Sequence, residues 1–245
     1  MHLPPWLKRL STRQPADIHP LIATNNQRFP VGAEYHHPIH EYDFVVFDTE
    51  LTGFNHKKDE VVAIGAVRIK GLQIQCGETF YALVRPYQRF QTKSTLVHRL
   101  TPQELHGADP MAEVLPRFLT FCGSAFLVGH FVRLDLDFIN RASQRLLGGG
   151  LTTPYFDTMC LAMAYNDFQH GTHSDHLPNQ GAYTLAALSQ EYGLPPFQGH
   201  NACQDALQTA YLFLYLIKKM RQMRLTTMQE YLVAGRNRSM LWWPY

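Results

Sequence analysis

The chain places two acidic residues directly behind an apolar run, in Phe44-Val45-Val46-Phe47-Asp48-Thr49-Glu50-Leu51-Thr52-Gly53. An unbroken apolar run of this kind predicts a central strand that is covered on both faces. Residues i and i+2 of a strand share a face, so Asp48 and Glu50 are expected to point to the same side at its exposed end. Their repulsion should raise both pKa values unless a cation lies between them. We therefore expect this strand end to bind a hard, oxygen-seeking ion, Mg²⁺ or Mn²⁺.

Two further acids lie far downstream, Asp135 at the end of residues 128–135 and Asp205 at the end of His200-Asn201-Ala202-Cys203-Gln204-Asp205. Prolines and a glycine before His200 predict a loop, and Asn201 is expected to cap a helix that starts just after it. Asp205 would then lie near the first helical turn, where the helix dipole favours the ionised carboxylate. His200 stands outside that helix and titrates near neutrality, so it is the expected general base.

Taken in order, these segments resemble the motifs of the DEDDh 3'→5' exonucleases, the group that contains the proofreading subunit of bacterial replicative DNA polymerase. The family pattern D-x-E-T-x-G corresponds to residues 48–53, H-N-x-x-F-D approximately to residues 130–135, and H-x-A-x-x-D to residues 200–205. Leu51 stands where the family often has Thr, and Phe131 where it usually has Asn, so substrate preference and positioning stay open. The resemblance implies a ribonuclease H-like α/β fold with a mixed five-stranded sheet flanked by helices.

The same resemblance implies a function and its residues. It implies a metal-dependent exonuclease that releases nucleoside monophosphates from 3' ends, with single-stranded DNA favoured over RNA as the substrate. Asp48, Glu50, Asp135 and Asp205 would hold two Mg²⁺ or Mn²⁺ ions, and His200 would take the proton of the attacking water. Residues expected to bind the terminal nucleotide are Leu51, Thr52, Gly53, Phe54, His98 and His130.

Two other functions are weighed against this one. The first is an exoribonuclease that trims RNA 3' ends, because the contacts that discriminate a 2'-hydroxyl are not visible in a sequence. The second is a non-catalytic module that binds nucleic acid beside a polymerase. The full carboxylate set argues against the second, since a pure binder gains nothing from negative charge placed beside phosphates. In every case nucleic acid is the expected partner, and a polymerase or another replication or repair protein is a further candidate.

Length and hydrophobic patterning indicate one exonuclease domain at residues 41–222, between an N-terminal extension (1–40) and a C-terminal tail (223–245). With 245 residues, of which 45% are hydrophobic, the chain is able to form a sizeable core. The expected strands are 43–49, 60–70, 74–84 and 125–129. The expected helices are 110–122, 134–147, 157–166, 183–192 and 202–223.

The net charge, the cysteine spacing and the distribution of apolar residues indicate the cellular compartment in which the protein is expected. The net charge of +2 does not by itself announce a nucleic-acid binder. The four cysteines are scattered without metal-ligand spacing, which is typical of thiols in a reducing compartment. No signal-peptide pattern or membrane-length apolar run is visible. We therefore expect a cytoplasmic protein without a membrane partner.

Three features outside the motifs allow more than one interpretation. An apolar stripe in residues 3–10 is expected to pack on the protein's own domain, with a partner protein as the alternative. Three histidines in residues 170–176 indicate a polar loop at the rim of the substrate groove, with a zinc site as the less favoured interpretation. Trp242 and Trp243 are expected to pack on their own domain, with base stacking as the alternative.

Overall fold

The computed structural model describes residues 18–55, 57–87, 100–170, 180–197, 199 and 201–236. The strands are β1 (Phe44–Leu51), β2 (Val61–Lys70), β3 (Gln73–Arg85), β4 (Asp109–Pro110), β5 (Phe126–Gly129) and β6 (Tyr155–Asp157). The α-helices are α1 (Pro20–Arg28), α3 (Pro102–His106), α4 (Met111–Cys122), α5 (Arg133–Leu147), α6 (Thr158–His170), α7 (Leu185–Glu191), α8 (Ala202–Arg221) and α9 (Met228–Arg236). Short 3₁₀ helices occupy Ile39–Glu41 and Gln180–Tyr183.

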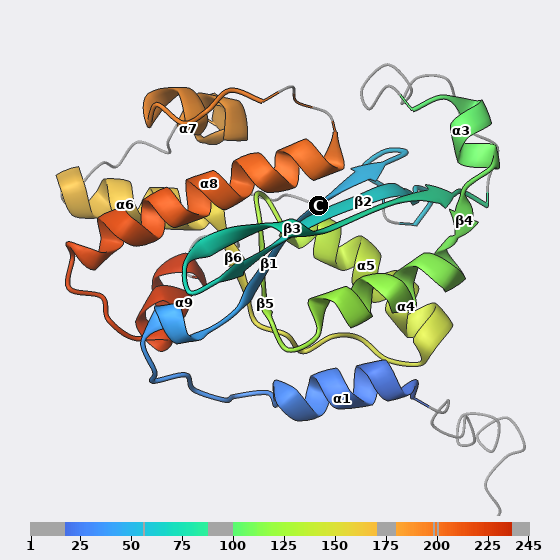
Figure 1. Ribbon diagram of the computed structural model, residues 1–245. Coiled ribbons are helices and arrows are strands. Elements are labelled where there is room, and N and C mark those ends of the chain that lie inside the picture. The colour runs from blue at the N-terminus through green and yellow to red at the C-terminus, as the bar shows by residue number, and fades with distance from the viewer. Residues whose placement is uncertain are drawn as a thin grey trace, which may run out of the picture.

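The strands form one mixed sheet in the order β4-β3-β2-β1-β5-β6 (Figure 1). β1, β2 and β3 are antiparallel neighbours, whereas β5 runs parallel to β1 and β6 runs parallel to β5. The α/β class and the mixed sheet are confirmed, but the expected number of five strands is wrong. Two short strands are not among the expected ranges: β6, which pairs with β5, and β4, which pairs two residues with the end of β3. A two-residue strand that contains a proline has no alternating pattern, so the sequence does not announce it.

β1 is the central strand that the apolar run predicted. Phe44 and Val46 point into the core on the α8 side, while Val45 and Phe47 point into the core on the α4 and α5 side. All four side chains are buried, as expected for a strand covered on both faces. Continuing the alternation directs Asp48 and Glu50 to the α8 side and Thr49 to the α5 side.

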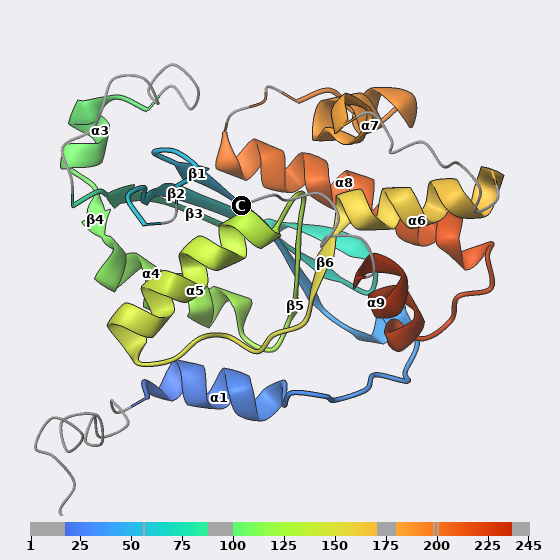
Figure 2. The same cartoon turned by 180° about the vertical axis from the view of Figure 1, so that it is seen from behind.

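Helices cover both faces of the sheet, as the two opposite views show (Figures 1 and 2). α6, α8 and α9 contribute buried side chains to one face, and α7 packs beside α8. α1, α4 and α5 contribute to the core of the other face. The result is a three-layer α/β/α arrangement in which the end of β1 lies between α8 and α5.

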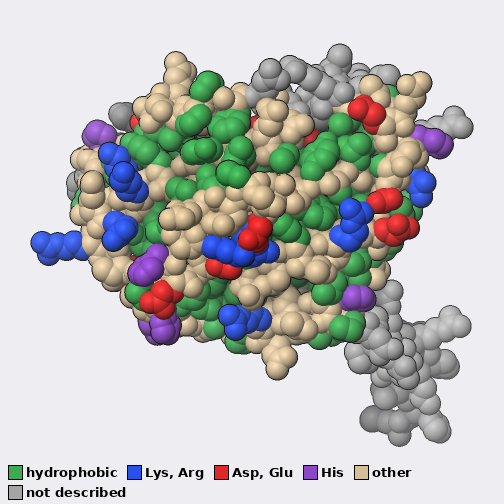
Figure 3. Space-filling model, viewed as in Figure 1, with side chains coloured by type: hydrophobic (Ala, Val, Ile, Leu, Met, Phe, Trp, Pro, Cys, Tyr) green, Lys and Arg blue, Asp and Glu red, His purple; other side chains and the backbone are tan. Residues whose placement is uncertain are grey.

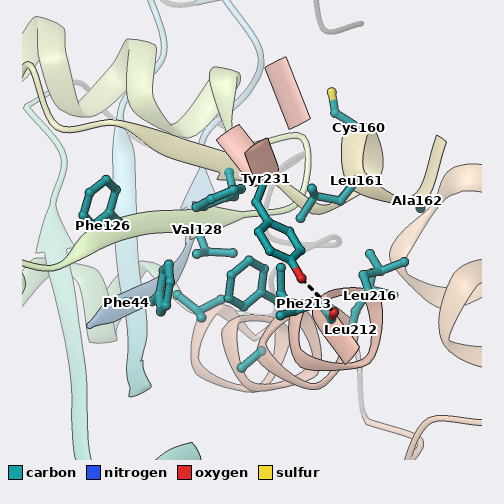
Figure 4. Close-up of a cluster of buried hydrophobic side chains, with 14 of the residues drawn as sticks. Phe44, Phe126, Val128, Cys160, Leu161, Ala162, Leu212, Phe213, Leu216 and Tyr231 are labelled. Carbon is teal, nitrogen blue, oxygen red and sulfur yellow. Dashed lines mark hydrogen bonds between the residues drawn. The ribbon is translucent and has the colours of Figure 1, made fainter. Parts of the chain in front are cut away.

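The core on the α8 side draws on segments that are distant in sequence. Tyr231 of α9 is fully buried beside Phe213 and Leu216 of α8 and Leu161 of α6 (Figure 4). Its hydroxyl donates to the backbone oxygens of Ile217 at 3.5 Å and Leu225 at 3.2 Å, so this buried polar group is satisfied. Burying a side chain of this size typically stabilises the fold by about 1.5–3 kcal/mol. Segments beyond both ends of residues 41–222 therefore contribute to the core, since Ile22 and Phe29 near α1 are buried as well.

The surface over α7 and α8 carries mixed side chains (Figure 3). Hydrophobic groups are spread among uncharged polar ones, and the Lys and Arg side chains are dispersed rather than gathered. Among the described helices, none combines the length and the apolar character that crossing a bilayer demands.

Candidate active site

Three of the predicted acidic residues meet at the end of β1. One carboxylate oxygen each of Asp48, Glu50 and Asp205 lies within 4.8 Å of the others. Asp48 and Glu50 come from β1, and Asp205 comes from the first turns of α8. Carboxylate oxygens this close are able to hold a metal ion of the hard, oxygen-binding class.

The approach of α8 depends on a glycine in β2. Gly65 is the register partner of Asp48, and a Cβ atom at Gly65 would lie 2.2–2.4 Å from backbone atoms of Ala202 and Cys203. Only a residue without a side chain lets the helix start lie directly on the sheet at this point. Gly65 therefore brings Asp205 to the strand end that carries Asp48 and Glu50.

The start of α8 is fixed by the predicted cap. The Asn201 side chain accepts from the backbone N–H groups of Cys203 at 3.2 Å and Gln204 at 3.1 Å, which confirms Asn201 as the N-cap. Asp205 reciprocates, since its Oδ2 accepts from the Asn201 backbone N–H at 3.2 Å. Helix capping and the position of Asp205 are thus coupled in one local structure.

The electrostatics of the cluster are those of crowded, buried acids. Burial, followed by the charges of Asp135, Asp205 and Glu50, raises the pKa of Asp48 well above its usual range. Burial, followed by Asp205 and Asp135, raises the pKa of Glu50 to about 7. Glu50 Oε1 is also buried without a hydrogen-bond partner among the residues that the structure describes. A buried carboxylate oxygen that lacks a donor is destabilising, and a bound cation would relieve both the repulsion and the missing partner. The donor set therefore fits a divalent ion.

Asp135, the fourth predicted acid, lies beside this cluster but is held differently. It sits in the first turn of α5, and its Oδ1 accepts from the Thr49 backbone N–H at 3.1 Å and from the Thr49 hydroxyl. Burial raises the pKa of Asp135 to about 7, against the opposing effect of the Thr49 hydrogen bonds, and the charge of Asp157 raises it further. Asp135 thus adds negative charge next to Asp48 while being tied to the α5 side of β1.

A fifth acid, Asp157, was not predicted as a site residue. It is 2% exposed at the end of β6, and its Oδ1 accepts from the backbone N–H groups of Phe131 at 3.1 Å and Met159 at 2.9 Å. Phe131 has a φ of 53°, a left-handed conformation that Asn tolerates better than Phe. Burial raises the pKa of Asp157 to about 6, although these backbone donors lower it. Asp157 therefore holds the turn that leads into α5 and Asp135, whereas the sequence indicated only that a helix starts here.

The turn after β1 is built around Asp59. The Thr52 hydroxyl donates to Asp59 Oδ1 at 3.0 Å, and the Asn55 backbone N–H donates to Oδ2 at 2.9 Å. A Cβ atom at Gly53 would lie 2.6 Å from Asp59 Oδ2, so a side chain at position 53 would displace the Asp59 carboxylate from these hydrogen bonds. Phe54 is 75% exposed, which excludes it from the core. Leu51 instead packs against the core on the α5 side.

Two ring-bearing residues lie near the cluster. His130 Nδ1 is 2.8 Å from the Thr158 hydroxyl, and burial lowers the pKa of His130 to about 4, against the raising effect of the Tyr183 backbone. This ring is therefore neutral at physiological pH.

Tyr81, which the sequence did not single out, pairs in register with Gly65 and hence shares a face with Asp48. It is 45% exposed, and burial followed by the charges of Glu50, Glu104 and Cys203 raises its pKa.

Several predicted residues lie outside the described part of the chain. His200 and His98 are among them, as are residues 3–10, two of the three histidines of the 170–176 segment, and Trp242 and Trp243. The remaining histidine, His170, is exposed at the end of α6.

Comparison with known proteins finds an exonuclease family and relatives named as DNA polymerase III proteins. The sequence profile of the exonuclease family called RNase T matches residues 45–213. DNA polymerase III PolC-type of Thermotoga maritima is 32% identical over 187 residues, which cover 76% of this chain and 13% of the relative. DNA polymerase III subunit epsilon of Aquifex aeolicus is 32% identical over 177 residues, which cover 72% of this chain and 81% of the relative. The chain thus spans only a small part of the PolC-type relative and most of the epsilon subunit.

Solved structures share the fold. Escherichia coli exonuclease I in complex with a dT13 oligonucleotide superposes with a TM-score of 0.62 at 17% identity, over 80% of this chain and 44% of that chain. Exonuclease X in complex with 5' overhanging duplex DNA superposes with a TM-score of 0.55 at 21% identity, over 78% of this chain and 99% of that chain. At these identities the likeness concerns the fold.

Proposed function

This chain belongs to the exonuclease family, and we propose that it hydrolyses phosphodiester bonds at the 3' ends of nucleic acids, with single-stranded DNA as the favoured substrate. The observation that carries this proposal is the meeting of Asp48, Glu50 and Asp205 within 4.8 Å, with a buried Glu50 oxygen that lacks a donor. We assign the activity to the domain at residues 41–222.

The metal ligands in this proposal are Asp48, Glu50, Asp135 and Asp205, and the metal is two ions of Mg²⁺ or Mn²⁺. When bound, such ions offset the charge of the carboxylates and of the phosphate and lower the pKa of a water molecule. Without them, a nucleic-acid phosphate would meet only negative charge at this strand end.

The chain's own residues supply the remaining steps. His200, next to the N-cap Asn201, accepts the proton of the attacking water. The water oxygen forms a bond to phosphorus while the bond between phosphorus and the 3' oxygen of the preceding nucleotide breaks. That 3' oxygen takes up a proton from protonated His200 or from solvent, and a nucleoside monophosphate is released. Thr49 and Asp157 keep Asp135 and its turn in place during this step.

The turn after β1 is the proposed contact for the terminal nucleotide. Leu51, Thr52 and Gly53 form the backbone of this turn, and the exposed Phe54 ring is available to stack on or wedge beside a base. His98 and His130 belong to the same proposed subsite. Because two relatives carry the name of DNA polymerase III, we also propose a polymerase or another replication protein as the partner.

The decisive test is the Asp205→Ala variant with labelled single-stranded oligonucleotides and Mg²⁺. We expect cleavage to fall at least about a thousandfold, because a ligand of the metal is lost. Chelation with EDTA should stop the wild-type protein, and Mg²⁺ or Mn²⁺ should restore it.

The matched control is Asp137→Ala. Asp137 is an exposed acid on α5, two positions from Asp135, and its removal should leave the rate within about twofold of wild type. Folding of both variants is checked by circular dichroism. A folded Asp205→Ala protein with near-normal rates, or cleavage that resists EDTA, would refute the metal-dependent mechanism.

A further inference from the structure

A second surface near the active site has the composition of a phosphate-binding region. Arg85, Tyr87, Arg141 and Arg145 line one hollow between the end of β3, the start of β2 and α5. We name these four residues the Arg–Tyr surface. None of them belongs to the three motifs from which the proposed function was argued.

Aromatic rings and the backbone hold two of the arginines in place. The Arg145 guanidinium carbon lies 5.5 Å from the centroid of the Tyr87 ring, and that of Arg141 lies 5.9 Å from the centroid of Phe138. Arg141 Nη2 also donates to the Asp59 backbone oxygen at 3.4 Å. Stacked guanidinium groups are ordered in advance, so they lose less entropy when they bind an anion.

The lining of this hollow carries more positive than negative charge, because it contains three arginines (Arg85, Arg141 and Arg145) and two acids (Asp59 and Glu60). Arg85, Arg141 and Arg145 form no ion pair with any described residue, whereas Arg68 and Lys70 are paired with Glu78 at 3.0 and 2.7 Å. Two acids line the same hollow, but their carboxylates accept other hydrogen bonds. Asp59 accepts from Thr52 and Asn55, and Glu60 accepts from the Tyr87 backbone N–H at 2.7 Å.

The Arg–Tyr surface is continuous with the proposed nucleotide-binding turn. Asp59 touches both regions, since its side chain supports Thr52 and Gly53 while its backbone oxygen binds Arg141. Along α5, Arg145 follows Asp135 by ten positions, which is a rise of about 15 Å. At the rise of about 3.4 Å per nucleotide of a stacked strand, that distance corresponds to roughly four nucleotides, and it corresponds to fewer in an extended single strand.

We propose that the Arg–Tyr surface binds the phosphate backbone of the strand that feeds the active site, up to about four nucleotides upstream of the 3' end. Guanidinium groups match phosphate oxygens in charge and geometry, and the Tyr87 ring, 63% exposed, offers a face for a base. This inference rests on the proposed function, because it names the path of that enzyme's substrate. It predicts that long substrates are used better than short ones.

The test is the double variant Arg85→Gln and Arg145→Gln, which changes two exposed arginines and leaves Arg141 to hold Asp59. Cleavage efficiency is measured with Mg²⁺ on a dinucleotide and on a single strand of about 20 nucleotides. We expect the ratio of long-substrate to short-substrate efficiency to fall about tenfold, because only the long strand reaches the surface. Binding of the long strand is measured in EDTA as a function of salt, where the slope of log K against log[salt] should decrease by about 1.4, or about 0.7 for each lost phosphate contact.

The control variant is Lys218→Gln and Arg221→Gln, which removes the same charge at the far end of α8, roughly 24 Å along the helix from Asp205. This control should keep the wild-type length ratio and salt slope. An equal change in both double variants, or an unchanged length ratio in the Arg85 and Arg145 variant, would overturn the proposal. Failure of the proposed function would be distinct, since the wild-type protein itself would then show no Mg²⁺-dependent cleavage of either substrate.

Discussion

Two groups of buried acids lie on opposite sides of β1, and they differ in what their oxygens meet. On the α8 side, Glu50 has a buried oxygen without a donor among the described residues, beside Asp48 and Asp205. On the α5 side, one oxygen of Asp157 accepts two backbone N–H groups, and one oxygen of Asp135 accepts two hydrogen bonds from Thr49. Burial raises the pKa in both groups, so burial alone does not separate a binding site from a structural acid. The supply of donors separates them.

The difference has opposite consequences for stability. Acids that receive backbone hydrogen bonds stabilise a turn, and removing them leaves buried donors unsatisfied. A buried acid whose oxygen lacks a donor, as at Glu50, destabilises the folded state until a cation arrives. Substitution of Asp157 should therefore cost stability, whereas substitution of Glu50 should cost activity.

The largest expected effect is that of Glu50→Gln on activity. Cleavage with Mg²⁺ should fall about a thousandfold, because an amide is a poor ligand for the metal. The metal-free variant should nevertheless be more stable than metal-free wild type at pH 8, by about 2 kcal/mol, because a buried charge is removed. Urea unfolding in EDTA measures the second quantity. A variant that is less stable than wild type at pH 8 would contradict the comparison.

The pH dependence of unfolding shows whether ionised Glu50 stabilises or destabilises the folded protein. The folded-state pKa of Glu50, about 7, lies above its ordinary value, so the stability linked to this group is fully present below pH 4.5 and is lost as the pH rises through 7. Wild type and Glu50→Gln should therefore agree near pH 4.5 and diverge by pH 8. His130 acts in the opposite sense, because its pKa is lowered to about 4 and its contribution is lost as the pH falls below 6.5. Both proteins share His130, so the difference between them isolates Glu50.

A smaller effect, on stability, is expected for Asp157→Ala. The variant leaves the buried N–H groups of Phe131 and Met159 without their acceptor, so the free energy of unfolding should fall by about 2–3 kcal/mol near pH 5. The loss should shrink toward pH 8, because the pKa of Asp157 is raised to about 6 and ionisation of the wild-type acid is itself unfavourable. Asp137→Ala, which removes an exposed acid from α5, serves as the control and should stay within about 0.5 kcal/mol of wild type. Equal stability of the Asp157 and Asp137 variants at pH 5 would show that Asp157 does not hold the turn.

The features that sequence predicted well are those with a local cause. The apolar run before Asp48 specifies a strand covered on both faces, and Asn201 specifies the start of α8 through hydrogen bonds to residues two and three positions away. These patterns lie within a few residues of each other. These structural features are therefore predictable from the sequence alone.

The features that sequence did not predict arise from contacts between distant segments. In the sequence, nothing distinguishes Gly65 from any other glycine within a strand. Its role comes from the packing of α8 against it at Ala202, 137 positions downstream. Asp157, at the end of β6, accepts a hydrogen bond from Phe131 in the turn that follows β5. Tyr81 is close enough for the charge of Glu50 to raise its pKa only because β3 pairs with β2. The strand β4 exists because the end of β3 offers a partner. In each case the cause is a tertiary contact that no local pattern encodes.

The smallest expected effect is that of Phe54→Ala, which tests a region outside both groups of acids. Phe54 is 75% exposed at the turn after β1, so its removal should leave the melting temperature and the metal dependence nearly unchanged. Substrate affinity or cleavage efficiency should fall by about 1–2 kcal/mol, or roughly 5- to 30-fold, because a ring that stacks on a base is lost. Phe168→Ala is the matched control, since Phe168 is a 57% exposed ring on α6 and belongs to none of the proposed contacts. The comparison uses melting curves together with kinetics on single-stranded 3' ends. If both variants cleave equally well, the turn after β1 does not hold the terminal base through Phe54, and the contribution of this turn would be limited to the backbone that Gly53 and Asp59 shape.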